Sequence, residues 1–376
     1  RLPGDTLAAK LSAPLPGAAV TAALAALAHL PSPPVAPKVR GAVAPPPFFR
    51  GVSLAMRNSV EDGYHAPGLG ERLARLSRLG ADAVSLMPFA FQPAADQPRL
   101  RYLNRGPASE TDVGVVHAAR AAHARGLRVL YKPHVWVGGG SWPGEIAMKN
   151  EADWALWWAS YRRFVLHHAF VAAWAESDVF SLGCELSKTV GRLAEWRDLI
   201  AAVRLFFPDA LTYSANWGED LDRVRFWDRL DLVGVDAYYP LSASPAASPR
   251  DLDRGAAAVV KKLAAAARRE GRPVLLTEVG FAARKAAWTA PSEEGGDYSE
   301  EDQEASYAAL FHALGRPSWL AGTFVWKAFS GGEDRPDRHQ RPGGRARQAD
   351  FRFLGRRAES AIAAYYGGAA MPAARP

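Results

Sequence analysis

The stretch LLTEVGF, Leu275–Phe281, is typical of a strand that carries an acid to the start of a loop. Its apolar run ends on the carboxylate Glu278. A parallel α/β barrel presents functional groups in this way, at the C-terminal ends of its strands. The stretch VFSLGCEL, Val179–Leu186, has the same form and places Glu185 at its end. We therefore expect these two glutamates to belong to one site.

Eight apolar runs rich in β-branched residues alternate with segments of helical spacing. The expected strands are Phe48–Met56, Ala81–Phe89, Leu127–Trp136, Val179–Leu186, Leu211–Trp217, Leu230–Tyr239, Pro273–Phe281 and Ala321–Phe329. The expected helices are Leu69–Leu79, Thr111–Arg125, Asn150–Ala175, Leu193–Phe206, Leu221–Trp227, Asp251–Glu270, Glu300–Leu314 and Arg356–Tyr366. Strands separated by helices pair in parallel through right-handed crossovers.

This alternation predicts an α/β fold, a (β/α)8 TIM barrel, which is also the size expected of residues 48–367. The alternative is an open doubly wound sheet, which usually carries a Gly-rich phosphate loop after its first strand. Here the first strand runs into Met56, Arg57 and Asn58 without such a loop. The barrel is expected to form a single catalytic domain.

The ends of the chain differ from this regular pattern. Residues 1–47 are an Ala/Pro-rich N-terminal extension, with a short helix expected within Ala18–Leu30, and residues 368–376 form a tail. We find no uncharged apolar run of the length that a membrane span requires. No targeting signal is visible in the sequence, which starts at Arg1.

The charge and cysteine content narrow the function classes. The net charge is +7, from 46 basic and 39 acidic residues, and the basic residues are scattered. No basic stripe is interleaved with aromatic residues, so nucleic acid is not an expected partner. The one cysteine, Cys184, excludes a disulfide framework. We interpret Cys184 as a small residue packed in the barrel, rather than as a nucleophile or metal ligand.

Polar and aromatic side chains collect at the expected C-terminal strand ends. They are Arg57, His134, Trp136, Glu185, Asn216, Trp217, Asp236, Tyr238, Tyr239, Glu278, Trp326 and Lys327, with Trp142, Trp288 and Tyr298 in loops. Aromatic faces bind the apolar faces of pyranose rings, and Asn, His and Tyr hold hydroxyl groups. By contrast, Trp154, Trp157 and Trp158 lie within a helix, where we expect core packing.

Two carboxyl groups among such side chains suit the cleavage of a sugar linkage. One carboxyl protonates the leaving oxygen, while the other attacks the anomeric carbon or activates water. The fourth and seventh strands are expected on opposite sides of the barrel, so that Glu185 and Glu278 approach across its mouth. A carboxyl separation of about 5 Å would give retention of anomeric configuration.

The sequence lacks the motifs typical of metal-dependent hydrolases and of acyl-transfer hydrolases. A metal site needs at least three protein ligands, and His134 alone does not supply them. The pair His167 and His168 lies within an expected helix, as a packed or solvated pair. No Gly-x-Ser-x-Gly elbow for acyl transfer is present. We expect neither a metal nor a cofactor.

The chain resembles glycoside hydrolase family 113 of the retaining glutamate-pair barrel clan, whose characterised members are mainly β-1,4-mannanases. The matching stretches are Lys132–Trp142, Leu182–Leu186, Leu211–Trp217, Phe226–Leu241, Pro273–Phe281 and Arg357–Tyr366, within residues 48–367. The resemblance implies that Glu185 is the acid/base and Glu278 the nucleophile. It also implies that Tyr238 hydrogen-bonds the nucleophile and orients it.

The resemblance further implies the substrate-binding residues. Asn216 and His134 would contact sugar hydroxyls, and Trp326 would form the floor of the subsite for the attacked ring. Independently of the resemblance, their places at strand ends or in a loop add Trp136, Trp142, Trp217 and Lys327 to the expected substrate-binding set. Many relatives in the wider clan carry Asn immediately before the acid/base, where it binds the 2-hydroxyl. Cys184 stands there in this sequence, so another residue must contact that hydroxyl.

We therefore expect a retaining β-glycoside hydrolase that cleaves β-1,4-mannosidic linkages in mannan or mannooligosaccharides by double displacement. The alternatives are a transglycosylase, a hydrolase of another β-linked glycan, and a non-catalytic glycan-binding barrel. The expected partner is an oligo- or polysaccharide, and we expect a monomer. A polysaccharide substrate favours a secreted or periplasmic location.

Overall fold

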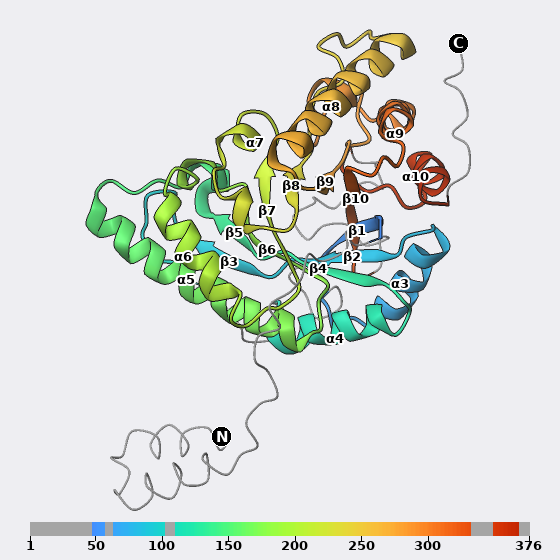
Figure 1. The fold of residues 1–376 in the computed structure, drawn as a ribbon. Helices are drawn as coiled ribbons and strands as arrows, with labels where there is room; N and C mark the ends of the chain where they lie inside the picture. The colour runs from blue at the N-terminus through green and yellow to red at the C-terminus, as the bar shows by residue number, and fades with distance from the viewer. Residues whose placement is uncertain (1–46, 57–62, 102–109, 332–348, 368–376) are drawn as a thin grey trace, which may run out of the picture. The chain divides into compact units, whose positions relative to one another are not determined.

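In the computed structural model, residues 47–56, 63–101, 110–331 and 349–367 are described, and they form a closed barrel of eight parallel strands (Figure 1). Its strands are β1 (Phe49–Ala55), β2 (Ala83–Leu86), β4 (Arg128–Tyr131), β6 (Val179–Cys184), β7 (Ala210–Asn216), β8 (Val233–Asp236), β9 (Val274–Val279) and β10 (Leu320–Phe329). Their order is β1-β10-β9-β8-β7-β6-β4-β2, and β2 pairs with β1 to close the ring. The predicted TIM barrel is confirmed.

The helices surround the barrel strands. They are α3 (Leu69–Arg78), α4 (Asp112–His123), α5 (Glu151–Trp174), α6 (Leu193–Val203), α7 (Asp220–Arg223), α8 (Pro249–Glu270), α9 (Glu300–Leu314) and α10 (Ala358–Gly367). Local sequence explains several boundaries. Ser248 and Asp251 form a capping box at the start of α8, and Gly271 ends that helix with φ 62°. The helix expected within Ala18–Leu30 lies outside the described residues.

Two of the expected strands are each broken into two. The run Ala81–Phe89 ends as a barrel strand at Leu86, and β3 (Phe89–Gln92) follows Pro88. The run Leu127–Trp136 divides in the same way around Pro133, giving β4 and β5 (His134–Val137). Proline has no N–H to donate to a neighbouring strand, so each of these two segments leaves the barrel sheet at its proline.

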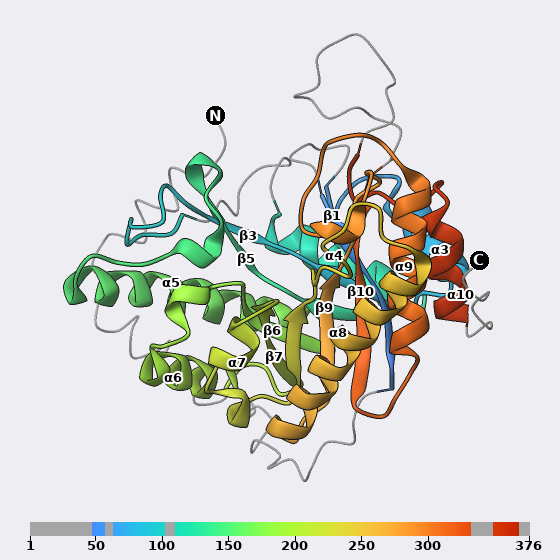
Figure 2. The ribbon, with the colours of Figure 1, turned by 90° about the horizontal axis from the view of Figure 1, so that it is seen from above.

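The second pieces, β3 and β5, pair in parallel as a separate two-stranded sheet, here called the ribbon. Figures 1 and 2 show it beside the barrel, on the side that carries α5. The prediction of two continuous barrel strands was wrong, although both prolines were visible in the sequence.

Two clusters make up most of the apolar core of the described residues. A smaller cluster gathers residues from strands all round the ring and so fills the barrel interior, with Phe49 and Phe324 in contact. Gly51 of β1 is needed there, because a side chain at this position would collide with the ring of Phe324. The larger cluster packs the helices against the outside of the barrel.

Helix α5 contributes aromatic side chains to the larger cluster. Trp154, Trp157 and Trp158 are all buried, as predicted. His168 is also buried and lies 2.8 Å from the hydroxyl of Tyr131, so the prediction of a packed position holds for this histidine.

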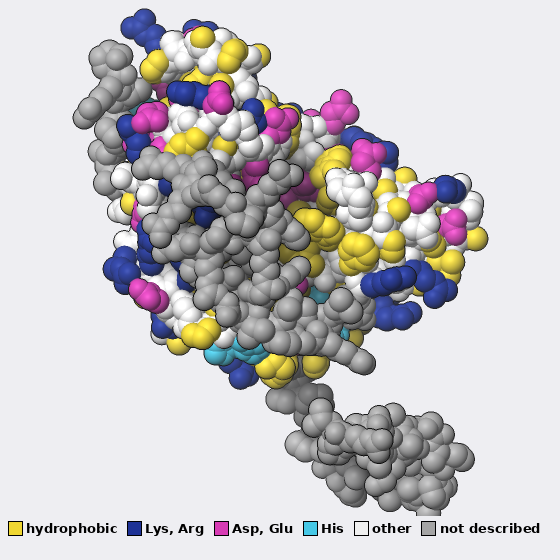
Figure 3. Space-filling model, turned by 180° about the vertical axis from the view of Figure 1, so that it is seen from behind, with side chains coloured by type: hydrophobic (Ala, Val, Ile, Leu, Met, Phe, Trp, Pro, Cys, Tyr) yellow, Lys and Arg dark blue, Asp and Glu magenta, His cyan; other side chains and the backbone are white. Residues whose placement is uncertain are grey.

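The surface carries no segment suited to crossing a bilayer: among the described helices, none is sufficiently long and apolar. In the coloured part of the face seen in Figure 3, a group of hydrophobic side chains lies among basic and acidic ones.

Candidate active site

Glu278 is the carboxylate that β9 delivers to the mouth of the barrel, and its side chain is buried. Each of its oxygens has a protein donor. The hydroxyl of Tyr238 donates to Oε2 over 2.6 Å, and the ammonium of Lys132 contacts Oε1. These two donors fix the orientation of the carboxyl group and favour its ionised form.

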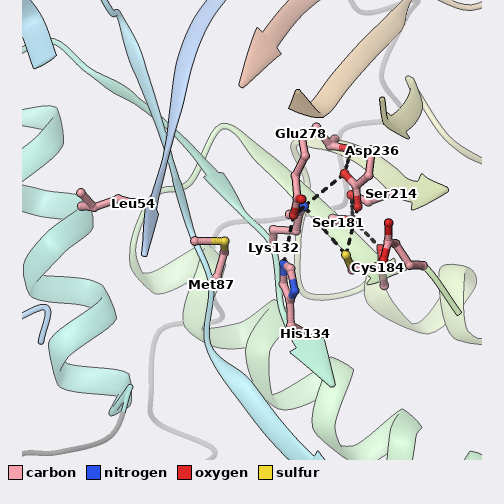
Figure 4. A network of polar contacts seen from close by, with 12 residues as sticks. Leu54, Met87, Lys132, His134, Ser181, Cys184, Ser214, Asp236 and Glu278 are labelled. Carbon is pink, nitrogen blue, oxygen red and sulfur yellow. Dashed lines mark hydrogen bonds and ion pairs between the residues drawn. The ribbon is translucent and has the colours of Figure 1, made fainter. Parts of the chain in front are cut away.

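Lys132 is the centre of a buried polar network (Figure 4). Its Nζ lies 3.2 Å from Asp236 Oδ1 and 3.8 Å from Cys184 Sγ, and the lysine is fully buried. Cys184 Sγ in turn donates to Asp236 Oδ2 over 3.1 Å, and Thr277 Oγ1 donates to Asp236 Oδ1 over 2.7 Å. One ammonium therefore offsets two buried carboxylates, and Cys184 belongs to this network as a hydrogen-bond donor.

Sequence reasoning did not assign a role to Lys132, and it treated Asp236 only as one of the strand-end residues. A signal was available. Lys132 follows the apolar run of β4, and Asp236 ends the apolar run of β8. A charged residue in a run that is otherwise buried requires a partner of opposite charge.

Opposing effects set the pKa of Glu278. Burial raises it most, followed by the negative charge of Asp236, whereas Lys132 and Tyr238 lower it. The balance raises the pKa of Glu278 to about 7. Asp236, the last residue of neighbouring β8, raises the pKa of Glu278, and Tyr238, two residues beyond this strand, lowers it.

Glu185 follows β6 directly, and its backbone has φ 55°, in the left-handed region. Such a conformation in a non-glycine residue costs about 1–3 kcal/mol and persists only where the surroundings impose it. Here the Glu185 amide donates to the carbonyl of Ser214 on β7 over 2.8 Å, and the Leu186 amide donates to the Tyr213 hydroxyl over 2.8 Å. These bonds hold the backbone that carries the Glu185 side chain.

The carboxyl of Glu185 has a different environment from that of Glu278. Burial raises its pKa most, then the charges of Asp236 and Glu278, to about 8. The indole N–H of Trp142 donates to Oε2 over 2.7 Å and lowers the pKa, as does the positive charge of Lys132. The charged ammonium of Lys132 contacts Glu278, whereas the donor to Glu185 is the neutral indole of Trp142.

A loop after β5 brings Trp142 to Glu185. Its ring lies against the backbone of Gly144, where any side chain would collide with the indole. Glu145 in the same loop pairs with Lys188 over 2.5 Å, and Lys188 lies just beyond Glu185 in the chain. The loops that carry the donor and the acceptor are thus tied to each other.

His134, at the start of β5, faces the same centre. Its Nε2 lies 3.9 Å from Glu278 Oε1 and is buried, and within the described part of the chain it has no hydrogen-bond partner. Burial, and then the charge of Lys132, lower the pKa of His134 well below its ordinary value, so the imidazole is neutral at pH 7. Its ring stacks on Trp326, with centroids 6.5 Å apart.

The other candidates lie around this centre. Asn216 ends β7, in register with Asp236. Trp217 and Trp326 are half-buried and pack against a small cluster that contains Tyr238 and Phe351. The barrel order separates β6 from β9 by two strands, so the two glutamates approach across the mouth without being diametrically opposite.

Other candidate residues contact different partners or lie further from this centre. Lys327 Nζ lies 3.5 Å from Glu294, and its ammonium is 5.1 Å from the centre of the Trp326 ring. Trp288 is buried and donates to the carbonyl of Ser244 over 2.9 Å. Trp136 is 60% exposed, further out on the ribbon. Arg57 lies outside the described residues.

Among the described residues, two groups of side chains place potential metal-ligating atoms within 4.8 Å of one another. In the first, His134, Cys184 and Glu278, the Lys132 ammonium already contacts the sulfur and the carboxylate. A cation there would meet a buried positive charge, so this group does not suit a metal. In the second, Asp112, His167 and His168, the ring nitrogen Nδ1 of His168 is taken up by Tyr131.

The matched family model and the solved structures agree on the identity of this barrel. Residues 57–337 match the model of Glycoside Hydrolase Family 113. A family 113 β-mannanase from Alicyclobacillus acidocaldarius, solved in complex with ManMIm, is 26% identical, with a TM-score of 0.74 over 86% of this chain and 98% of that one. No curated protein matches the sequence.

Other solved structures support the fold. A family 113 β-1,4-mannanase is 24% identical, with a TM-score of 0.73 over 85% of this chain and 99% of that one. A family 5 mannosidase from Rhizomucor miehei is 12% identical, with a TM-score of 0.59 over 87% of this chain and 94% of that one. The family match spans most of the chain, and the protein belongs to glycoside hydrolase family 113.

Proposed function

We propose that this glycoside hydrolase cleaves β-1,4-mannosidic linkages in mannan or mannooligosaccharides with retention of anomeric configuration. The reaction class follows from the family, and a glycan substrate follows with it. The choice of mannose is supported by the two family 113 structures described above, both of β-mannanases. The observation that carries the assignment of roles is the contrast between the surroundings of Glu278 and Glu185.

Glu278 has the surroundings of a nucleophile. Lys132 and Tyr238 each contact one of its oxygens and stabilise the carboxylate. In the first step, this carboxylate attacks the anomeric carbon as the bond from that carbon to the leaving oxygen breaks. The product of the step is a covalent glycosyl ester on Glu278.

Glu185 has the surroundings of an acid/base. Burial and the charges of Asp236 and Glu278 raise its pKa to about 8, so at neutral pH it supplies the proton that the leaving oxygen needs. Once the leaving group has gone, Glu185 takes a proton from water. The water oxygen attacks the anomeric carbon, and the ester to Glu278 breaks, which regenerates both carboxyl groups.

The supporting side chains act on the sugar or on the glutamates. Tyr238 orients the nucleophile. The neutral His134, whose Nε2 has no hydrogen-bond partner among the described residues, contacts a sugar hydroxyl. Asn216 and Trp326 bind the attacked ring. Trp142 holds Glu185, and Trp217 and Lys327 line the outer part of the site.

The function is tested by incubating the protein with mannan, mannooligosaccharides, β-glucan and xylan, followed by product sizing. We expect mannan cleavage, and NMR of the first product should show the β-anomer. Glu278→Gln should abolish turnover, whereas Glu301→Gln, at an exposed site on α9, should retain it. Ordinary turnover by Glu278→Gln, or an initial α-anomer, would contradict the mechanism. Product analysis at high oligosaccharide concentration separates hydrolysis from transglycosylation.

A further inference from the structure

The ribbon of β3 and β5 presents an unusual face. Its side chains alternate between the two faces, as in any strand. Ala90, Gln92, Val135 and Val137 are buried on one side. The residues of the other side are Phe89, Phe91, His134 and Trp136. Every side chain on this second face is a ring, and the register pairs them as Phe89 with His134 and Phe91 with Trp136.

This aromatic face starts at the proposed catalytic centre. Figure 4 shows His134 turned toward Glu278, and the two side chains are 3.9 Å apart. The ring of His134 lies 5.1 Å from that of Phe89, and Phe89 lies 6.2 Å from Trp136. Exposure increases outward, since Phe91 is 40% and Trp136 60% exposed. The rings therefore lead from the glutamates to the surface.

The buried face fixes the ribbon in place. The indole N–H of Trp157 on α5 donates to Gln92 Oε1 over 3.0 Å, and Gln92 Nε2 donates to the carbonyl of Ala94 over 2.9 Å. Phe91 also exchanges two backbone hydrogen bonds with Arg101. Trp157 and these backbone bonds thus hold the ribbon in place while Phe91 and Trp136 remain exposed on its other face.

Exposed aromatic rings in a fixed row need a partner with flat apolar faces and polar edges. Side chains two residues apart on a strand are roughly 6.6 Å apart, so Phe91 and Trp136 lie one such step beyond Phe89 and His134. A pyranose chain whose linkage lies between Glu185 and Glu278 would present its next rings to this row. Continuity with the site favours a glycan over a second protein surface.

We propose that Phe91 and Trp136 form a distal sugar-binding platform that holds further pyranose units of the β-linked chain being cleaved. The platform makes the enzyme prefer polymeric over short substrates. This inference rests on the proposed function, since it needs a glycan bound at the two glutamates.

The test compares a polymer with a short substrate. Phe91→Ala, Trp136→Ala and the double variant are assayed on soluble mannan and on mannotriose. Removing each ring should lower the ratio of kcat/KM for mannan to that for mannotriose about tenfold, equivalent to about 1.4 kcal/mol. Trp174→Ala is the matched control, because Trp174 is 48% exposed at the end of α5, away from the ribbon. It should retain the wild-type ratio.

The outcomes separate the platform from the proposed function. An unchanged ratio in the double variant, with normal turnover, overturns the platform and leaves the function standing. If the wild type cleaves glucan or xylan instead of mannan, the assigned sugar fails, and the same ratio is measured on that polymer. If the wild type cleaves none of these polymers, binding is measured instead, by affinity electrophoresis in gels that contain each polymer. Retardation that the double variant loses supports the platform, and equal mobility of the two proteins overturns it.

Discussion

Replacing Lys132 by Met removes an ammonium that contacts both Glu278 and Asp236. All three side chains are buried, so water does not replace the lost interaction. Methionine preserves most of the side-chain volume, and the variant therefore tests charge more than packing. Two buried carboxylates would remain with no cation between them.

The expected loss of stability follows from this geometry. Removing one partner of a buried ion pair costs about 3–5 kcal/mol. The pKa of Glu278, which Lys132 lowers, would rise further above its ordinary value. A carboxyl whose folded-state pKa is raised contributes stability that is present below its unfolded pKa and lost as pH rises through the folded pKa. The deficit in melting temperature should therefore be larger at pH 8 than at pH 5.

Replacing Lys132 by Met should also lower kcat/KM. The proposed nucleophile must be ionised, so the acidic limb of kcat/KM reports the pKa of Glu278. Losing about 3 kcal/mol of charge stabilisation corresponds to about two pKa units. The acidic limb of the kcat/KM profile should therefore move to higher pH by about two units, and kcat/KM at pH 7 should fall about a hundredfold.

Two assays check this prediction: thermal unfolding at pH 5 and pH 8, and kcat/KM on mannooligosaccharide across pH. Lys149→Met removes an exposed lysine paired with Asp96 and should change neither result. The double variant Lys132→Met, Asp236→Asn removes one charge of each sign and should regain part of the stability. An acidic limb at its wild-type position in Lys132→Met, or a deficit that does not depend on pH, would refute the reasoning.

Three further predictions concern the rest of the site and its support. The pKa values of about 7 for Glu278 and about 8 for Glu185 predict that kcat/KM falls below and above this narrow range; full activity at pH 10 would argue against Glu185 as the acid. Trp142→Phe removes the indole donor to Glu185, so the alkaline limb should rise by about one pH unit, and an unmoved limb would contradict this. Trp157→Ala should destabilise the protein by about 3–5 kcal/mol in denaturant unfolding, because Trp157 is fully buried, whereas Trp174→Ala should have little effect.

Local patterns in the sequence were sufficient to predict the barrel architecture. Apolar runs that alternate with helical spacing predict parallel strands with crossover helices, because each pattern buries one face of its own element. The same logic placed Glu278 and Glu185 at strand ends, where a barrel collects side chains from distant segments. The prolines that divide Ala81–Phe89 and Leu127–Trp136 were visible, but a single strand cannot show that two such pieces will pair with each other.

The sequence by itself determined the barrel, the family and the two glutamates that begin and end the proposed reaction. Only the tertiary structure decided which side chains surround each glutamate. Lys132 just after β4, Asp236 from β8 and Cys184 from β6 meet around Glu278, while Trp142 reaches Glu185 from a loop. Charges separated by up to 146 positions interact there because barrel closure buries them together, and their strength depends on that burial. The stretch LLTEVGF supplies the carboxylate, and the folded barrel supplies the environment that distinguishes it from its partner.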